Sequence, residues 1–192
     1  IAINGLVLWT KGGTGVVKNQ DGDVLQWQDL SGNNNHFNLS SGDDVMEVSS
    51  SIGGKPAIRF DGTNAMTVTN ALSGDNTVMV VGKVHGEIRR MLVTSSNEDW
   101  ALGWYSFYQD AYYSGGWVVF PSSRSTTDPV IYTCTEDSGE DSYSLFKNGN
   151  LLASNNNGSG SIGPGKLAIG GAAQHARSTF SQGDIAEIIV FN

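Results

Sequence analysis

The chain has 192 residues, of which 39% are hydrophobic and only 16% are charged. Its net charge of −8 and its sequence pI near 4.6 oppose binding to the phosphate backbone of nucleic acids or to anionic membrane surfaces. We therefore expect no nucleic-acid partner. No stretch approaches the ~18 apolar residues of a membrane-spanning helix, so we expect no insertion into a membrane.

Short strand-like segments follow one another along the chain, and no apolar pattern at helical spacing persists. Each segment is rich in Val, Ile, Thr and aromatic residues and is bounded by turn-forming residues. The predicted strands are 5–10, 23–30, 56–62, 65–70, 76–84, 87–95, 99–107, 115–120, 129–135, 142–149, 150–154, 166–171 and 184–192.

This succession of strands without helices predicts an all-β fold in which two antiparallel sheets pack face to face as a β-sandwich. The pair Asn148-Gly149, between two alternating apolar runs, predicts a hairpin with a type I′ turn. The Gly/Ser/Asn-rich stretch 154–166 is interpreted as a long loop, because the strands on either side pair poorly alone. We therefore expect a single domain over 1–192. The chain begins at Ile without a signal peptide, as a mature or excised fragment does.

The segment WQDLSGNNNHFNLSSG, residues 27–42, places a run of turn formers between a Trp and a Phe. Asp29 and Ser31 can accept hydrogen bonds from nearby backbone N–H groups while a Gly or Asn adopts the left-handed conformation. This interpretation is architectural, with the two aromatic rings facing the core. The alternative is that the side chains of 33–36 reach a ligand, or that Asp29 contributes to a calcium site.

Five segments, in this order along the chain, resemble the laminin-G-like, concanavalin A-like jelly-roll domains: GLVLW, WQDLSGNNNHF, KPAIRFDGTN, SLFKNGNLL and GDIAEIIVFN. The resemblance implies a jelly-roll β-sandwich over nearly the whole chain. This architecture serves lectins, glycoside hydrolases and lyases, so the fold alone assigns no function. The resemblance also implies a structural calcium near the terminal strands, for which Asp184 is a candidate ligand.

Catalytic signatures are absent from the sequence. Related hydrolases carry alternating carboxylates on one strand, and no such pattern is present; the acidic cluster 136–141 is interpreted as a solvated turn. His36, His85 and His175 are too dispersed to form a spacing-based metal motif. The single cysteine, Cys134, cannot form an intramolecular disulfide and is expected to be a buried thiol.

The stretch 97–120 holds nine aromatic residues, half of those in the chain. If 99–107 is one strand, residues of alternate parity share a face, so Trp100 and Trp104 point one way and Tyr105 the other. Both faces of this strand are then aromatic. A core takes one of them, so the other must lie in a groove, under a loop or at an interface.

Tyr and Trp present a flat apolar body with a polar tip, which suits stacking on a sugar ring, and polar neighbours can bond the sugar hydroxyls. We therefore predict a carbohydrate-binding site. Its candidate residues are Tyr105, Tyr108, Gln109, Tyr112, Tyr113, Trp117 and Arg89, with Arg90 and Arg124 as further partners.

The sequence thus predicts a non-catalytic domain that targets a polysaccharide, tethered to other domains of a larger secreted or cell-surface protein. One alternative is a structural or adhesion domain of a surface or virion protein, whose aromatic patch binds a protein. The other is a glycoside hydrolase or polysaccharide lyase whose carboxylates are brought together by the fold.

Overall fold

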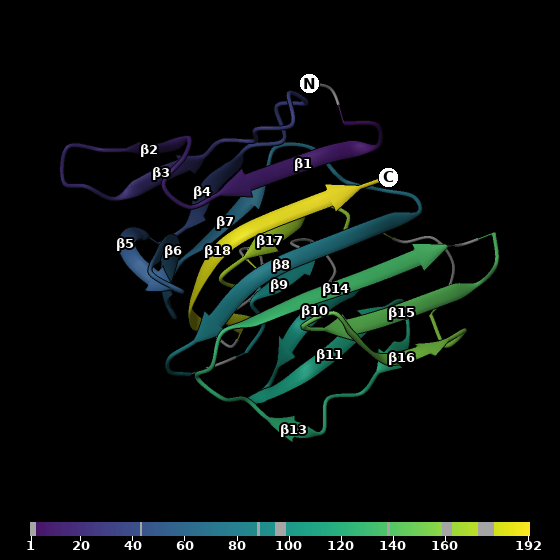
Figure 1. Ribbon diagram of the computed structural model, residues 1–192. Helices are drawn as coiled ribbons and strands as arrows, with labels where there is room; N and C mark the ends of the chain where they lie inside the picture. The colour runs from purple at the N-terminus through teal and green to yellow at the C-terminus, as the bar shows by residue number, and fades with distance from the viewer. Residues whose placement is uncertain are drawn as a thin grey trace.

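The computed structural model describes residues 3–42, 44–87, 89–94, 99–137, 139–158, 163–172 and 179–192. Two antiparallel sheets pack face to face (Figure 1), and this part of the chain contains no α-helix. The predicted all-β, two-sheet sandwich is confirmed. Nor does any element here have the length and apolar character of a membrane-crossing helix.

The sheet nearer the viewer in Figure 1, which we call sheet A, has eight strands. They are β1 (Leu6–Lys11), β5 (Met46–Ile52), β6 (Lys55–Asp61), β8 (Asn76–Val84), β14 (Val130–Asp137), β15 (Ser142–Lys147), β16 (Asn150–Asn155) and β18 (Gln182–Phe191). Their order is β16-β15-β14-β8-β18-β6-β5. The long closing strand β18 pairs with β8 on one side, and with β6 and then β1 on the other.

The opposite sheet, which we call sheet B, has ten strands. They are β2 (Val16–Lys18), β3 (Val24–Trp27), β4 (Phe37–Ser41), β7 (Ala65–Val68), β9 (Leu92–Thr94), β10 (Trp100–Tyr105), β11 (Tyr108–Ser114), β12 (Trp117–Val119), β13 (Ser123–Arg124) and β17 (Leu167–Ile169). Their order is β12-β11-β10-β9-β17-β7-β4-β3-β2, and β13 pairs with β11.

The core lies between the sheets because alternate residues of each strand point inward. Along β8 burial alternates at every position, as expected for a strand with one face on the core. The largest fully buried side chains come from both sheets: Trp27, Trp100, Trp104, Tyr112, Tyr132 and Tyr143. Cys134 is a buried free thiol, as predicted, and burial raises its pKa to about 12.

Local turn signals located one hairpin correctly and missed another. Asn148 and Gly149 have φ angles of 51° and 79°, which confirms the type I′ turn between β15 and β16. The predicted strand 99–107 is wrong at its end, because β10 stops at Tyr105 and a second strand, β11, returns from Tyr108. The sequence also gave no sign of β2, β4, β5 or β13.

The polar segment 27–42 is a corner that ties sheet B to β1. The Asp29 carboxylate accepts backbone N–H groups of Trp9 and Ser31 on Oδ1, at 2.9 and 2.8 Å. On Oδ2 it accepts the Ser31 hydroxyl and the Asn35 N–H, at 2.8 and 3.0 Å. Four hydrogen bonds hold this buried carboxylate to its own corner, so the calcium ligand role considered for Asp29 is replaced by an architectural one.

The neighbouring polar side chains are also used inside the corner. Asn33 and Asn35 donate from their side-chain amides to the carbonyl oxygens of Leu6 and Val7, at 2.9 and 2.8 Å. His36 Nδ1 accepts the backbone N–H of Asp29 at 2.9 Å. These contacts favour the architectural interpretation over ligand binding.

Candidate functional site

The β10–β11 hairpin turns through two residues with left-handed backbone. Ser106 and Phe107 have φ angles of 47° and 73°, the sign required at both central positions of a type I′ turn. Gly and Asn normally supply this conformation, because a larger side chain is strained there. The sequence signal for the turn was therefore missing.

A third left-handed residue, Asp110, lies in the same hairpin, with φ of 68°. It is the extra residue of a β-bulge, because Gly103 pairs with Ala111 and Trp104 pairs with Gln109. Seven non-glycine residues with positive φ occur in the described part of the chain, and three of them are in this hairpin. Such strain persists where surrounding structure imposes it, and it gathers at functional sites.

Side chains from sheet A hold the bulge. The Tyr132 hydroxyl donates to Asp110 Oδ1 at 2.6 Å and accepts the Asp110 N–H at 3.1 Å. Lys147 Nζ lies 2.8 Å from the same carboxylate oxygen. Burial and then the hydrogen bond to Asp110 raise the pKa of Tyr132 above its ordinary value, so the hydroxyl keeps its proton. The hairpin is thereby fixed from beneath.

An aromatic cluster covers the outer face of this end of sheet B. Trp117 is at its centre, with ring centroids 5.0 Å from Tyr105, 5.1 Å from Tyr113 and 5.1 Å from Phe120, all edge to face. Tyr108 adjoins the cluster as the cross-strand partner of Tyr105. We call these five side chains the aromatic platform. Edge-to-face packing fixes the rings before any ligand arrives.

A hollow of about 430 Å³ opens on the platform. Its lining residues are Tyr105, Ser106, Tyr108, Phe120, Pro121 and Ser122. Its walls are mainly aromatic, with hydroxyl groups at their edges, and no carboxylate or histidine is among these lining residues. The aromatic rings in the hollow can stack on the apolar face of a ligand ring, and the hydroxyl groups can hydrogen-bond polar groups at the rim of that ligand ring.

Three guanidinium groups lie over rings of this hairpin: Arg89 over Phe107 at 4.3 Å, Arg90 over Tyr105 at 4.9 Å, and Arg124 over Tyr108 at 5.0 Å. Arg90 also donates to the Tyr105 hydroxyl at 3.3 Å. Cation–π contacts at such distances are favourable and orient both partners. The platform is therefore bordered by positive charge in an acidic protein.

Four of the predicted site residues, Tyr105, Tyr108, Tyr113 and Trp117, gather on this face. Tyr112 does not, because it pairs with the buried Leu102 and lies on the inward face of β11, opposite to its neighbour Tyr113. Its ring is fully buried against Trp100, with centroids 6.3 Å apart, and burial raises its pKa. The assignment of Tyr112 to the site is wrong.

Two other predicted residues have different roles, and one was missed. Gln109 pairs with Trp104, and its side-chain oxygen accepts the Thr126 N–H at 3.4 Å, away from the hollow. Arg89 is engaged by Glu87 at 2.6 Å. Phe120, which is 68% exposed, is a wall of the hollow that the sequence analysis did not select.

Asp184, the candidate calcium ligand, is fully buried under cationic side chains on sheet A. Arg59 binds it through two hydrogen bonds of 2.7 and 2.8 Å, and the Ser51 hydroxyl donates at 2.5 Å. Lys83 Nζ and His85 Nε2 lie 3.7 and 3.4 Å from it. A carboxylate so surrounded by positive charge does not attract a second cation, so the Asp184 assignment is corrected to an ion-pair network.

Metal ligands do not gather elsewhere in the described ranges, where no group of three or more His, Cys, Asp and Glu residues could hold an ion. His175 falls outside those ranges. A structural calcium therefore stays a prediction without assigned ligands.

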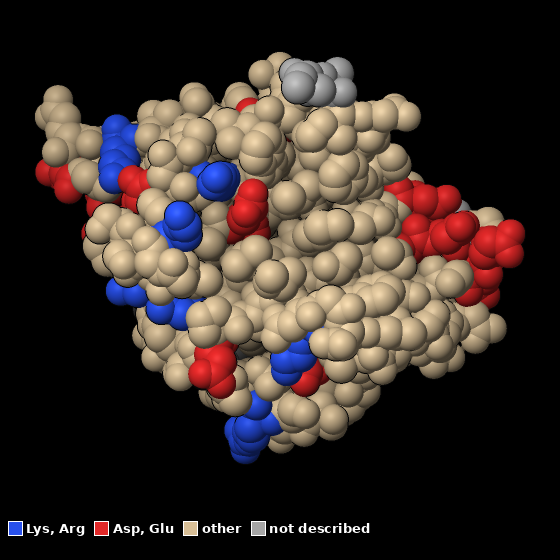
Figure 2. Space-filling model, viewed as in Figure 1, with Lys and Arg blue, Asp and Glu red and all other residues tan. Residues whose placement is uncertain are grey.

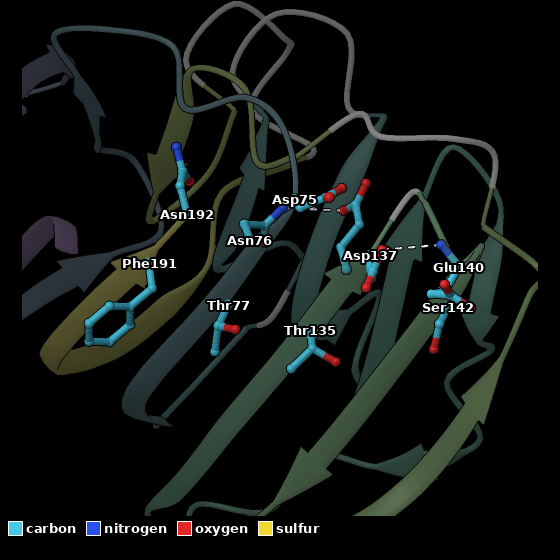
Figure 3. A pocket seen from close by; sticks show the side chains of 10 residues that line it. Asp75, Asn76, Thr77, Thr135, Asp137, Glu140, Ser142, Phe191 and Asn192 are labelled. Atoms are coloured by element: carbon cyan, nitrogen blue, oxygen red, sulfur yellow. Dashed lines mark hydrogen bonds between the residues drawn. The ribbon is translucent and has the colours of Figure 1, made fainter. Parts of the chain in front are cut away.

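Acidic residues concentrate at the end of sheet A where β14 ends and β15 begins (Figure 2). A hollow of about 530 Å³ there is bordered by Asp75, Asp137 and Glu140 (Figure 3). Asp137 Oδ1 accepts the backbone N–H of Gly139 and of Glu140, which makes it a turn residue. Residues 139–141 form the exposed turn that the sequence predicted, and Asp137 is the exposed last residue of β14.

Glu136 departs from that prediction. It is on the inward face of β14 and only 3% exposed. The Ser114 hydroxyl donates to Glu136 Oε2 at 3.0 Å, and the Asn76 side-chain amide donates to the same oxygen at 3.4 Å. It is a buried, hydrogen-bonded carboxylate that joins the two sheets.

The outer face of sheet A is a second surface that sequence reasoning missed. Five successive strand pairs align one cross-strand row: Trp9, Ile189, Met79, Thr133, Phe146 and Leu151. Figure 2 shows few charged side chains on this face. The row is a broad, mainly apolar strip.

No family model and no curated protein matches the sequence. Solved structures share the fold. Domain 4 of AbnA, an extracellular GH43 arabinanase of Geobacillus stearothermophilus, in complex with arabinotriose, has a TM-score of 0.65 at 13% identity, over 97% of this chain and 92% of that one.

Two larger proteins are similar over part of their length. The binding domain of Paraclostridial Mosquitocidal Protein 1 has a TM-score of 0.70 at 14% identity, over 97% of this chain and 48% of its own. Trypanosoma rangeli sialidase in complex with sialic acid has a TM-score of 0.61 at 12% identity, over 97% and 30%. The chain thus spans about half of the first and a third of the second. Because the sequence identities are this low, the structural similarity establishes the shared β-sandwich fold alone.

Proposed function

We propose that this β-sandwich is a non-catalytic carbohydrate-binding domain that targets a polysaccharide through the aromatic platform. The observation that carries the proposal is the hollow between Tyr105, Tyr108 and Phe120, where prepacked rings and hydroxyl groups meet. Sugars present an apolar C–H face and a hydroxyl rim. The aromatic rings can stack on the apolar face, and the hydroxyl groups can hydrogen-bond the rim. Fold neighbours that bind arabinotriose or sialic acid support it.

Binding without chemistry follows from the residues around the hollow. Hydrolysis of a glycosidic bond needs two carboxyl groups on either side of it, roughly 5 to 10 Å apart. The lining residues include no carboxylate, and Asp110 is held beneath the hairpin by Tyr132 and Lys147. As an accessory module of a larger secreted or surface protein, the domain gains avidity because tethering raises the local concentration of its partner domains.

Affinity electrophoresis against a panel of neutral and acidic polysaccharides, with reducing ends assayed in parallel, tests this function. We expect retardation in at least one gel without release of reducing ends. Parallel gels with calcium and with chelator show whether the predicted calcium takes part. Product release that one Asp or Glu substitution abolishes would instead establish the hydrolase or lyase alternative. No retardation on any glycan contradicts the proposal.

The second candidate function is protein interaction, which the apolar strip of sheet A favours. Its cross-strand row, from Trp9 to Leu151, has the composition of a surface that a protein covers. A stable protein interface buries on the order of 800 Å² on each partner. Concentration-dependent association in sedimentation velocity, abolished by Phe146→Asp, would support it.

A further inference from the structure

We propose that the ligand of the aromatic platform is an anionic glycan, whose carboxylate or sulfate group is bound beside Arg124 and Arg90. This inference rests on the proposed function and names the class of sugar. The chain carries a net charge of −8, yet arginines border the platform and no carboxylate lines its hollow.

The cations around the platform differ in how far they are already neutralised. Arg89 is paired with Glu87 at 2.6 Å, and Lys147 is paired with Asp110 at 2.8 Å. Arg124 is exposed and has no ion-pair partner among the described residues. Its guanidinium group is therefore the cation most ready to take an external anion.

The position of Arg124 is fixed by the fold. Its backbone pairs with Tyr108 in the short ladder between β13 and β11, and its guanidinium lies 5.0 Å from the centroid of the Tyr108 ring. Stacking on a ring limits the rotamers of a long side chain, so less conformational entropy is lost when it binds an anion. A guanidinium also matches carboxylate and sulfate oxygens with two parallel N–H donors.

Arg90 provides the opposite border. Tyr105 and Tyr108 are cross-strand partners and both line the hollow, with Arg90 over the first ring and Arg124 over the second. Each of the two tyrosines that line the hollow thus carries a guanidinium group on its ring. A neutral hydroxyl group accepts a hydrogen bond from a guanidinium, whereas an acidic substituent also gains the attraction of opposite charges and can accept two parallel N–H donors.

The test compares probes that differ only in charge. Polygalacturonate and its fully methyl-esterified form test a carboxylate, and dextran sulfate and dextran test a sulfate. We expect the acidic member of one pair to bind roughly tenfold more tightly in 50 mM salt, with the difference shrinking in 500 mM salt, because exposed charges are screened. The pair that shows the preference identifies which anion is bound.

Substitutions show which side chain causes the preference for the acidic probe. Arg124→Gln should remove most of the preference for the acidic probe, and Arg124→Lys should keep part of it, because lysine retains the charge without the planar fork. Lys55→Gln makes the same change of net charge on an exposed residue of β6 and should change nothing.

The outcomes separate this inference from the function on which it rests. Equal binding of the acidic and neutral probes by the wild-type protein overturns the anionic ligand and leaves carbohydrate binding standing. A preference that survives Arg124→Gln overturns the placement of the anion. Absence of binding to every glycan overturns the proposed function itself.

Discussion

Replacing Asp184 with Leu is expected to lower the free energy of unfolding by about 3 kcal/mol, because removing one member of a buried ion pair leaves its partners without compensation. The carboxylate is fully buried and satisfies Arg59 and Ser51 directly. Urea denaturation followed by Trp fluorescence measures the change. Asp137→Asn, at an exposed turn residue, is the matched control and should change stability by less than about 0.5 kcal/mol.

The same carboxylate makes stability depend on pH. Burial acts to raise the pKa of Asp184, but hydrogen bonds from Arg59 and Ser51 outweigh it, so the pKa is lowered overall. Stability from this group is therefore fully present above the unfolded-state pKa of about 3.9, and is lost as the pH falls through the lower folded-state pKa. The difference between wild type and Asp184→Leu should narrow below about pH 4. A difference below about 1 kcal/mol at pH 7 contradicts the network's role.

The substitution Tyr108→Ala is expected to weaken glycan binding about thirtyfold, which corresponds to a loss of about 2 kcal/mol. Tyr108 lines the hollow, pairs across the hairpin with Tyr105 and carries Arg124 on its ring. Removing the ring deletes the stacking surface and releases the arginine. Isothermal titration with the best glycan of the panel measures the change.

Two controls separate stacking from other effects of that substitution. Tyr108→Phe keeps the ring and should retain most of the affinity. Phe146→Ala removes an aromatic ring from the apolar strip of sheet A and should leave glycan affinity unchanged. If Phe146→Ala weakens binding and Tyr108→Ala does not, glycans bind sheet A and the platform is packing.

The sequence correctly predicted those features of the fold that depend on residues close together in the chain. Strand β8 has the predicted bounds, 76–84, because a run rich in Val is flanked on both sides by turn-forming residues. The Asn148-Gly149 turn is found where it was expected, because these two residues adopt positive φ at low cost. Composition alone also identified the aromatic stretch that forms the platform.

What the sequence could not predict depends on contacts between distant residues. The Ser106-Phe107 turn lacks Gly or Asn, and the bulge at Asp110 is held by Tyr132 and Lys147 from the other sheet. Tyr112 was assigned to the site because it lies near turn residues in the sequence, and that nearness does not show that it faces the core while Tyr113 faces outward. Likewise, Arg59 and Asp184 are 125 residues apart in the sequence, so no local sequence motif predicts their ion pair.

The central claim, that the platform binds carbohydrate, is tested most directly by the indole N–H resonances of the five tryptophans in a ¹H–¹⁵N spectrum during glycan titration. Trp117 is at the centre of the platform, whereas the Trp9 indole donates to Glu187 on sheet A at 2.8 Å. We expect the Trp117 resonance to shift with saturation while that of Trp9 stays fixed. A saturable shift of Trp9 with Trp117 unmoved would contradict the account.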